Sequence, residues 1–208
     1  MSALAILHLD ESCLGNGREG DNPGGGGGLI EARTPAGRIQ RRDVFISAPA
    51  TTNNRMALES ATVALRLLAG KGARLQVLVV SDSQYLVRGM REWVRGWAAR
   101  GWTRKGGPIE NLALWQALVA SARLHEVQWT WVRGHQGHAK NEYANDLAVL
   151  AAREQRSSGG LVESDFGPWL ERQRAKGRYL AYDPDETFDI LARRVAEPDE
   201  AVPLSLDG

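Results

Sequence analysis

Two aspartates, Asp10 and Asp82, each stand at the end of a short apolar run in the 208-residue chain. Residues 75–81 form a continuous apolar run of the kind that makes a strand buried on both faces, and Asp82 follows it directly. A first strand ends in the same way at Asp10. Sites in α/β proteins are usually built at the carboxyl ends of strands, and a second aspartate at such an end favours a functional role for both. The alternative for Asp82 is that it only caps the next helix.

Composition narrows the class of protein. The chain is 43% hydrophobic, which is enough for a core, and its one cysteine, Cys13, excludes an intramolecular disulfide and fits a reducing compartment. We find no leader signal and no membrane-length apolar run, so we expect a cytoplasmic protein without a membrane partner, and a monomer. Residues 1–155 carry a net charge of +5 and residues 156–208 a net charge of −4, which favours a polyanionic partner for the body.

The hydrophobic pattern predicts an α/β fold. Strands at 4–10, 29–33 and 39–47 form an antiparallel meander, and a helix at 51–68 crosses over to the strand at 75–81, which lies parallel to the first. Glycines 24–28 could form a phosphate-binding loop, but no Walker lysine follows them. We therefore predict that they form the close-packed start of a strand. The remaining expectations are helices at 84–102, 109–122 and 141–154, a strand at 127–132 and a loop at 134–139.

Tryptophans alternate with basic residues between positions 88 and 105. This pattern suits either the core of a helical hairpin or a nucleic-acid surface, in which guanidinium groups neutralise phosphates and flat rings pack on sugars. The residues concerned are Arg88, Arg91, Trp93, Arg95, Trp97, Arg100, Trp102, Arg104 and Lys105.

Seven motifs lie in register with those of type 1 ribonucleases H, and the chain resembles that family over residues 3–153. The motifs are LHLDESCLGN (7–16), TTNNRM (51–56), VSDSQYLVRGM (80–90), GWAARGW (96–102), ENLALWQAL (110–118), WVRGHQGH (131–138) and NEYANDLA (141–148). The resemblance implies a ribonuclease H-like fold, a five-stranded mixed sheet flanked by helices. It also implies hydrolysis of the RNA strand of RNA/DNA hybrids with two Mg²⁺ (or Mn²⁺) ions, which activate a water and stabilise the leaving oxygen.

Two of the family's four metal-binding carboxylates are absent from their places. Asp10 and Asp82 match two of them, but Ala57 stands where the family has glutamate and Asn145 where it has the last aspartate. Asn145 still offers a neutral carbonyl oxygen, whereas Ala57 offers no ligand. The loss of two negative charges should weaken metal binding.

Glu59 and Glu11 are the candidates to compensate. Glu59 lies on the same helix as Ala57 but about 200° further around it. Glu11 adjoins Asp10, although neighbouring strand residues point to opposite faces. We prefer Glu59 slightly and take Asp10, Asp82, Asn145 and Glu59 as the predicted metal ligands. The alternative is that both glutamates are solvent-facing bystanders.

Further roles follow from the resemblance alone. His135 matches a mobile histidine that assists proton transfer or product release, whereas His138 is expected to be structural. Positions that match contacts to the minor groove and the 2′-hydroxyls are Cys13, Asn16, Asn53, Asn54 and Gln84. Thr52 matches a phosphate-binding threonine. The family's basic protrusion is matched by Trp93, Trp97, Arg100 and Trp102. Ala98 and Ala99 stand where lysines are common, so we expect loose hybrid binding with a shallow salt dependence.

The sequence therefore predicts a ribonuclease H domain at 1–155 and an acidic, partly helical C-terminal extension at 156–208. The apolar and aromatic side chains of the extension favour packing, and a solvated appendage is the alternative. The predicted activity is metal-dependent cleavage of hybrids at an atypical site. The rival is a catalytically weak or silent hybrid-binding protein, and deliberate introduction of Ala57 to trap a complex is a third reading.

Overall fold

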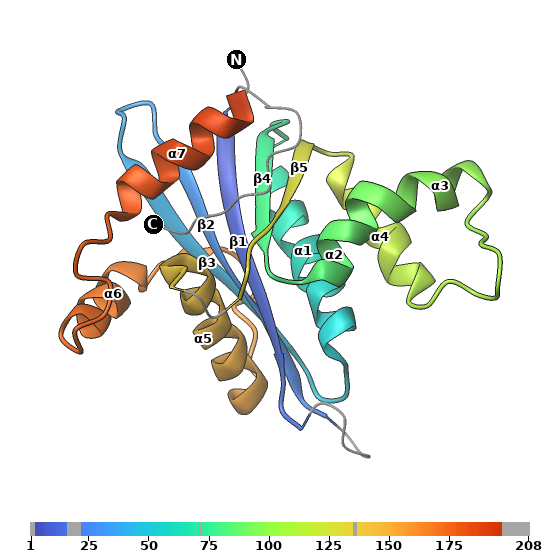
Figure 1. The fold of residues 1–208 in the computed structure, drawn as a ribbon, viewed down its shortest axis with the longest axis horizontal. Helices are drawn as coiled ribbons and strands as arrows, with labels where there is room; N and C mark the ends of the chain where they lie inside the picture. Colours follow the sequence, from blue (N-terminus) through green and yellow to red (C-terminus); the bar gives the residue numbers. More distant parts are fainter. Residues whose placement is uncertain (1–2, 16–21, 71, 135–136, 197–208) are drawn as a thin grey trace.

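The computed structural model describes residues 3–15, 22–70, 72–134 and 137–196. A mixed sheet lies at the centre, with the strand order β5-β4-β1-β2-β3-β6 (Figure 1). Strands β1 (Leu4–Cys13), β2 (Gly24–Arg33) and β3 (Ile39–Ala48) form the antiparallel meander, and β4 (Gln76–Ser81) and β5 (Glu126–Trp131) run parallel to β1. The predicted mixed α/β sheet is confirmed. Its sixth strand, β6 (Val162–Glu163), pairs with β3 and comes from the C-terminal extension.

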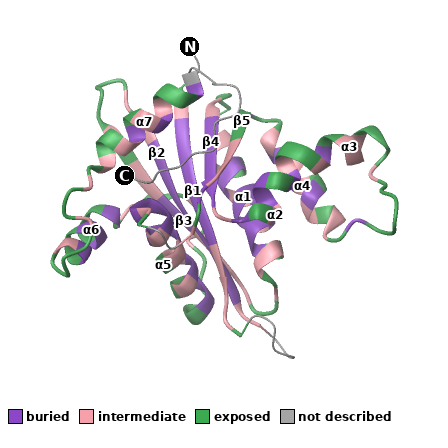
Figure 2. Cartoon of the chain, in the orientation of Figure 1, coloured by how far each residue is buried: buried purple, intermediate pink, exposed green. Residues whose placement is uncertain are grey.

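One face of the sheet is covered by α1 (Asn53–Ala69), α2 (Gln84–Arg88) and α4 (Leu112–Ala122). Alternate residues of the central strands, such as Leu7 and Leu9, pack on this side against buried residues of α1. Figure 2 shows that burial is greatest along the central strands and the helix faces that meet them. This layer contains the fully buried Trp115, whose indole N–H donates to the Tyr85 hydroxyl at 3.0 Å.

The other face is covered by α5 (Ala139–Glu154) and by two helices of the extension, α6 (Phe166–Arg174) and α7 (Pro184–Ala196) (Figure 1). Phe188 and Leu191 of α7 are 1% exposed and pack against Ile6 of β1 and neighbouring strand residues. Phe166 and Trp169 of α6 pack on Tyr143 of α5. The part of the extension that the structure describes is therefore packed on the sheet, and it is not a solvated appendage.

The glycine run lies within a strand and is not only the strand entry that we predicted for residues 24–28. All five glycines belong to β2, and a Cβ on Gly25 or Gly27 would lie 2.7 Å from a backbone nitrogen of α5. Glycine is required there because the α5 backbone lies directly on the strand. The sequence suggested close packing but not its partner.

The predicted helix at 84–102 is interrupted. A π-helical turn, η1 (Gly89–Trp93), separates α2 from α3 (Val94–Ala99), and a loop leads on to α4. Gly89 lies in this turn against the Trp115 ring, where a Cβ would overlap the indole. Figure 1 shows this segment, called the protrusion below (residues 89–111), extending away from the sheet.

Candidate active site

Asp10 and Asp82 meet at the edge of the sheet where β1 and β4 end. The parallel register pairs Leu9 with Ser81, so the next residues along the two strands are the two aspartates. Strand alternation also places both on the α5 face. The negative charge of Asp82 acts on Asp10, which is only 6% exposed. The two carboxylates on which the sequence prediction depended therefore do lie together.

Further contacts hold Asp82 in place. The indole N–H of Trp131 donates to its backbone carbonyl at 3.0 Å. Gly134 lies against its side chain so closely that a Cβ at that position would overlap Oδ2. A glycine at position 134 is therefore needed for the Asp82 carboxylate to keep its place.

Glu11 joins this pair from the opposite face of β1. It pairs in register with Gly26, whose side faces Ser60 of α1. Glu11 hydrogen-bonds with the Ser83 side chain, and the charges of Asp10 and Asp82 both act on it. Glu11 thus brings a carboxylate to the aspartates from the α1 side of the sheet, which is the side of Ala57.

The structure does not bring Glu59 to the aspartates. Within the described residues, Glu59 is absent from the groups whose charges or hydrogen bonds act on Asp10 and Glu11. Ala57 is 1% exposed and lies in the core between α1 and the sheet, and Glu59 is about 200° away from it around the helix. The geometry therefore favours Glu11 over the preferred candidate, Glu59.

Asn141 is a site residue that the sequence analysis did not single out. Its Nδ2 donates to Asp10 Oδ2 at 2.6 Å, and its Oδ1 is buried without a hydrogen-bond partner in the described part of the chain. The signal was the NE pair of the quoted NEYANDLA motif. Asn145, one helical turn later, is half-buried on the same side of α5. Asp146 is turned away and accepts the Trp169 indole N–H at 2.8 Å.

Burial and like charge raise the pKa of both neighbouring acids, Asp10 and Glu11. Burial, followed by the charge of Asp82, raises the pKa of Asp10 to about 7, against the opposing hydrogen bond from Asn141. Burial and the charges of Asp10 and Asp82 raise the pKa of Glu11 to about 8. Within the described residues, no basic side chain offsets these effects on either acid.

The donor set fits a divalent cation, which would supply the missing positive charge to these oxygens. Among the described residues, however, no three Asp, Glu, His or Cys side chains already converge as a metal site. Glu11 is turned to Ser83, so it would have to rotate to become a ligand. Asp10 and Asp82 are the carboxylates already placed for that role, with Asn145 as a neutral neighbour.

Two predicted site residues, His135 and Asn16, lie outside the described residues. Gly134, the last described residue before His135, lies beside Asp82. His138 precedes α5, and its backbone carbonyl accepts from Glu142 at 2.9 Å.

Several predicted substrate contacts gather where β1, β2 and α1 meet. A Cβ on Gly24 would lie 2.9 Å from Cys13 Sγ and would overlap Thr51, so the end of β1 adjoins the start of α1. Thr52 is exposed and caps α1, accepting from the Arg55 backbone N–H at 3.3 Å. Asn53 and Asn54 follow in the first turn, and the Oδ1 of Asn53 is buried without a described partner. Gln84 is exposed at the start of α2, after Asp82 and Ser83.

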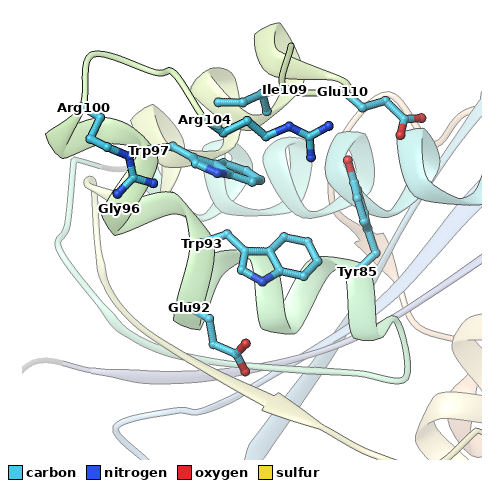
Figure 3. Close-up of a pocket in the computed structure, with 9 residues that line it drawn as sticks. All are labelled: Tyr85, Glu92, Trp93, Gly96, Trp97, Arg100, Arg104, Ile109 and Glu110. Atoms are coloured by element: carbon cyan, nitrogen blue, oxygen red, sulfur yellow. The ribbon is translucent and has the colours of Figure 1, made fainter. Parts of the chain in front are cut away.

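The protrusion carries a second group of predicted contacts. Trp93 and Trp97 line a pocket of about 520 Å³. Figure 3 shows the two indoles between Arg100 on one side and Tyr85 on the other. Both indoles pack on Trp115, at centroid distances of 6.4 and 5.7 Å, and both remain half-buried. Each ring is therefore anchored in the core, as the helical-hairpin interpretation predicts, and also borders the pocket; contact with nucleic acid stays a prediction. Trp102 is half-buried nearby, with φ +62°, and does not line this pocket.

Comparisons with known proteins show the family of the chain. The family model RNase H matches residues 3–153. The chain is 40% identical over 153 residues to a ribonuclease H of Pelobacter propionicus, covering 73% of this chain and 86% of that protein. It is 46% identical over 152 residues to a ribonuclease H of Methylorubrum extorquens, covering 73% of this chain and 61% of that protein.

A solved structure is also similar. LC9-RNase H1, a type 1 RNase H with the type 2 active-site motif, is 57% identical, with a TM-score of 0.77 and 81% of each chain covered. LC11-RNase H1, solved in complex with an RNA/DNA hybrid, shares the fold at 20% identity and a TM-score of 0.52, with 73% of this chain and 98% of that chain covered. The predicted fold and the resemblance are confirmed, and the chain belongs to the ribonuclease H family of hydrolytic nucleases.

Proposed function

We propose that this chain cleaves the RNA strand of RNA/DNA hybrids at a divalent-metal site in which Glu11 replaces the family glutamate missing at Ala57. The proposed ligands are Asp10, Glu11, Asp82 and Asn145. The observation that carries the proposal is the placement of Glu11, a half-buried carboxylate that hydrogen-bonds with the Ser83 side chain and on which the charges of both aspartates act. It restores one of the two missing negative charges.

Mg²⁺ or Mn²⁺ bound there would activate the attacking water and stabilise the leaving oxygen. The residues of the chain have separate tasks. Asn141 holds Asp10 by its hydrogen bond, which favours the ionised carboxylate. Glu11 and Asp10 release protons to bind a cation, and His135 assists proton transfer near the scissile phosphate.

The substrate lies, in this proposal, across the start of α1 and the protrusion. Residues Cys13, Asn16, Asn53, Asn54 and Gln84 read the minor groove and the 2′-hydroxyls, which distinguish RNA from DNA. Thr52 binds a phosphate, and Trp93, Trp97, Arg100 and Trp102 contact the hybrid at the protrusion. We further propose a cytoplasmic monomer. Separately, the described residues include no helix that could span a membrane.

The test is cleavage of a labelled hybrid with Mg²⁺ and with Mn²⁺. Glu11→Gln should lower the rate at subsaturating metal about 100-fold or more, because it removes a charged ligand from the metal. Glu59→Gln is the matched control on α1 and should stay within about twofold of the parent. Asn145→Asp should increase the rate by restoring a carboxylate.

The rival function predicts a different outcome. A hybrid-binding protein without activity would bind the hybrid tightly with or without metal and show no turnover with either ion. Equal losses in Glu11→Gln and Glu59→Gln would also contradict the proposed ligand set, although they would leave the enzyme class intact.

A further inference from the structure

The first turn of α5 is attached to the C-terminal extension on both sides of Asn141. The Lys140 ammonium donates to the Pro184 carbonyl at 2.9 Å, at the start of α7. Glu142 forms an ion pair with Arg178, which lies between α6 and α7. Asn141, between these two residues, donates to Asp10. The residue that holds a proposed metal ligand is therefore flanked by two residues held by the extension.

Tyr143 continues this attachment. Its ring packs edge-on against Phe166 and Trp169 of α6, at centroid distances of 5.3 and 5.5 Å. Its hydroxyl donates to Asp43 Oδ2 at 2.5 Å, and the same oxygen accepts the Asp165 backbone N–H at 3.2 Å. Lys140, Glu142 and Tyr143 thus contact the extension, and Asn141 among them contacts Asp10.

A buried ion-pair network connects the same turn to the sheet. Lys140 lies 2.7 Å from Glu31 Oε2, and the two side chains are 2% and 0% exposed. Glu31 Oε1 accepts from Arg41 at 2.9 Å, and Arg41 also pairs with Asp185 of α7 at 2.5 Å. Lys140 therefore has little freedom to move, because its charge is fixed by Glu31 and its direction by the Pro184 carbonyl.

We propose that the C-terminal extension is a positioning element for the active site. By holding Lys140 and Glu142 it fixes the first turn of α5, and with it the hydrogen bond from Asn141 to Asp10. Hydrogen-bonding partners of metal-binding carboxylates orient the ligand, and their loss typically lowers metal affinity or activity 10–100-fold. The consequence for cleavage rests on the function proposed above, whereas the effect on Asn141 does not.

The test compares Arg178→Gln and Lys140→Gln with Asp189→Asn in the full-length protein. Asp189 forms an ion pair with Arg33, so Asp189→Asn removes a contact between α7 and β2 without touching α5. Arg178 is half-exposed, so its variant should fold even if Lys140→Gln, at a buried position, does not. Three quantities are measured for each: the NMR signal of the Asn141 side-chain amide in metal-free protein, Mn²⁺ affinity by calorimetry, and the Mg²⁺ concentration for half-maximal hybrid cleavage.

We expect the Asn141 amide signal to shift or broaden in both α5-linked variants and to stay unchanged in Asp189→Asn. Mn²⁺ affinity should fall, and the Mg²⁺ requirement rise, about 10-fold for Lys140→Gln and about threefold for Arg178→Gln, at or below the lower end of the usual range. These shifts should persist well below each melting temperature, because positioning, and not global unfolding, is their cause.

An unchanged Asn141 signal and unchanged metal affinity in Arg178→Gln would overturn the proposal, even if the melting temperature fell, because the extension would then only stabilise the fold. Absence of hybrid cleavage in the parent protein would instead overturn the proposed function. The NMR measurement would still decide the positioning role in that case, since it needs neither metal nor substrate.

Discussion

Strand β1 carries two buried charged clusters only two residues apart, and they differ in the sign of their partners. His8 belongs to the first, in which Glu31 also meets Lys140 and Arg41. Burial alone would raise the pKa of Glu31, but the hydrogen bond with His8 and the charge of Lys140 outweigh it and lower the pKa to about 2. Asp10 belongs to the second, in which acids adjoin acids and the pKa values of Asp10 and Glu11 rise to about 7 and 8.

The difference is whether the fold itself supplies cations to the buried acids. Glu31 has its cations built into the fold, so its ionised form stabilises the protein. Asp10 and Glu11 lack such cations among the described residues, so the ionised forms destabilise the metal-free protein. A divalent cation would reverse that effect at the second cluster and would have no role at the first.

The second cluster, formed by Asp10 and Glu11 with Asp82, is called the acid-only cluster below. Replacement of one of its carboxylates should give the largest effect on activity. Asp10→Asn should lower hybrid cleavage by more than about 10³-fold, since it removes a charged metal ligand. The same change should raise the free energy of unfolding of metal-free protein at pH 9 by about 1–2 kcal/mol. Urea denaturation checks the second effect, and a loss of stability at pH 9 would contradict the account.

The pH dependence of that gain has a definite sign. Because the pKa of Asp10 is raised in the folded state, the folded protein binds more protons than the unfolded chain between about pH 4 and pH 7. Stability of the metal-free parent should therefore fall as the pH rises through this window. Asp10→Asn should flatten the decline and should give no gain at pH 4.

The matching change in the first cluster, at Glu31, should have the opposite effect on stability. Glu31→Gln should lower the free energy of unfolding at pH 7 by about 3–5 kcal/mol, because it leaves Lys140 buried without its carboxylate. The pKa of Glu31 is lowered on folding, so the difference from the parent should shrink as the pH falls from about 4.5 towards 2. A stabilising effect in urea denaturation at pH 7 would remove the distinction between the two clusters.

The smallest expected effect is a change in hybrid affinity, caused by substitutions that lie away from both clusters. Ala98→Lys with Ala99→Lys adds two positive charges to the protrusion, where the sequence predicted loose binding. Hybrid affinity should rise severalfold at low salt, and the logarithmic salt slope should steepen by about 1–2, measured by titration in Ca²⁺ or without metal. The Mg²⁺ concentration for half-maximal cleavage should stay constant, and a change in it would mean that the protrusion affects the acid-only cluster.

The sequence predicted the parts of the site that local pattern determines. Asp10 and Asp82 could be paired because each follows an apolar strand run, and parallel neighbours end at one edge. Glu11 could not be preferred over Glu59, because strand alternation placed Glu11 on the wrong face. In the structure Glu11, on the α1 face, still lies near the aspartates at the end of the strand. It hydrogen-bonds with Ser83, the residue after Asp82, and the charges of both aspartates act on it.

Other features depend on contacts between distant segments. His8, Glu31, Arg41 and Lys140 are scattered over more than a hundred positions, so no spacing indicates that they meet. The extension showed apolar and aromatic side chains but not the face they cover. Asn141 stood within a quoted motif, yet only its hydrogen bond to Asp10 gives it a role.

Proton release on metal binding would show whether Asp10 and Glu11 are the acids that hold the cation. Ligands must be deprotonated to bind a cation, so Mn²⁺ binding at pH 7 should release about one proton or more from Asp10 and Glu11 together. Calorimetric titration in buffers of different ionisation enthalpy measures this number. We expect the number of protons released to fall towards zero at pH 9.5 and to decrease in Glu11→Gln but not in Glu59→Gln. Binding at pH 7 without proton release, or with equal release in both variants, would contradict it.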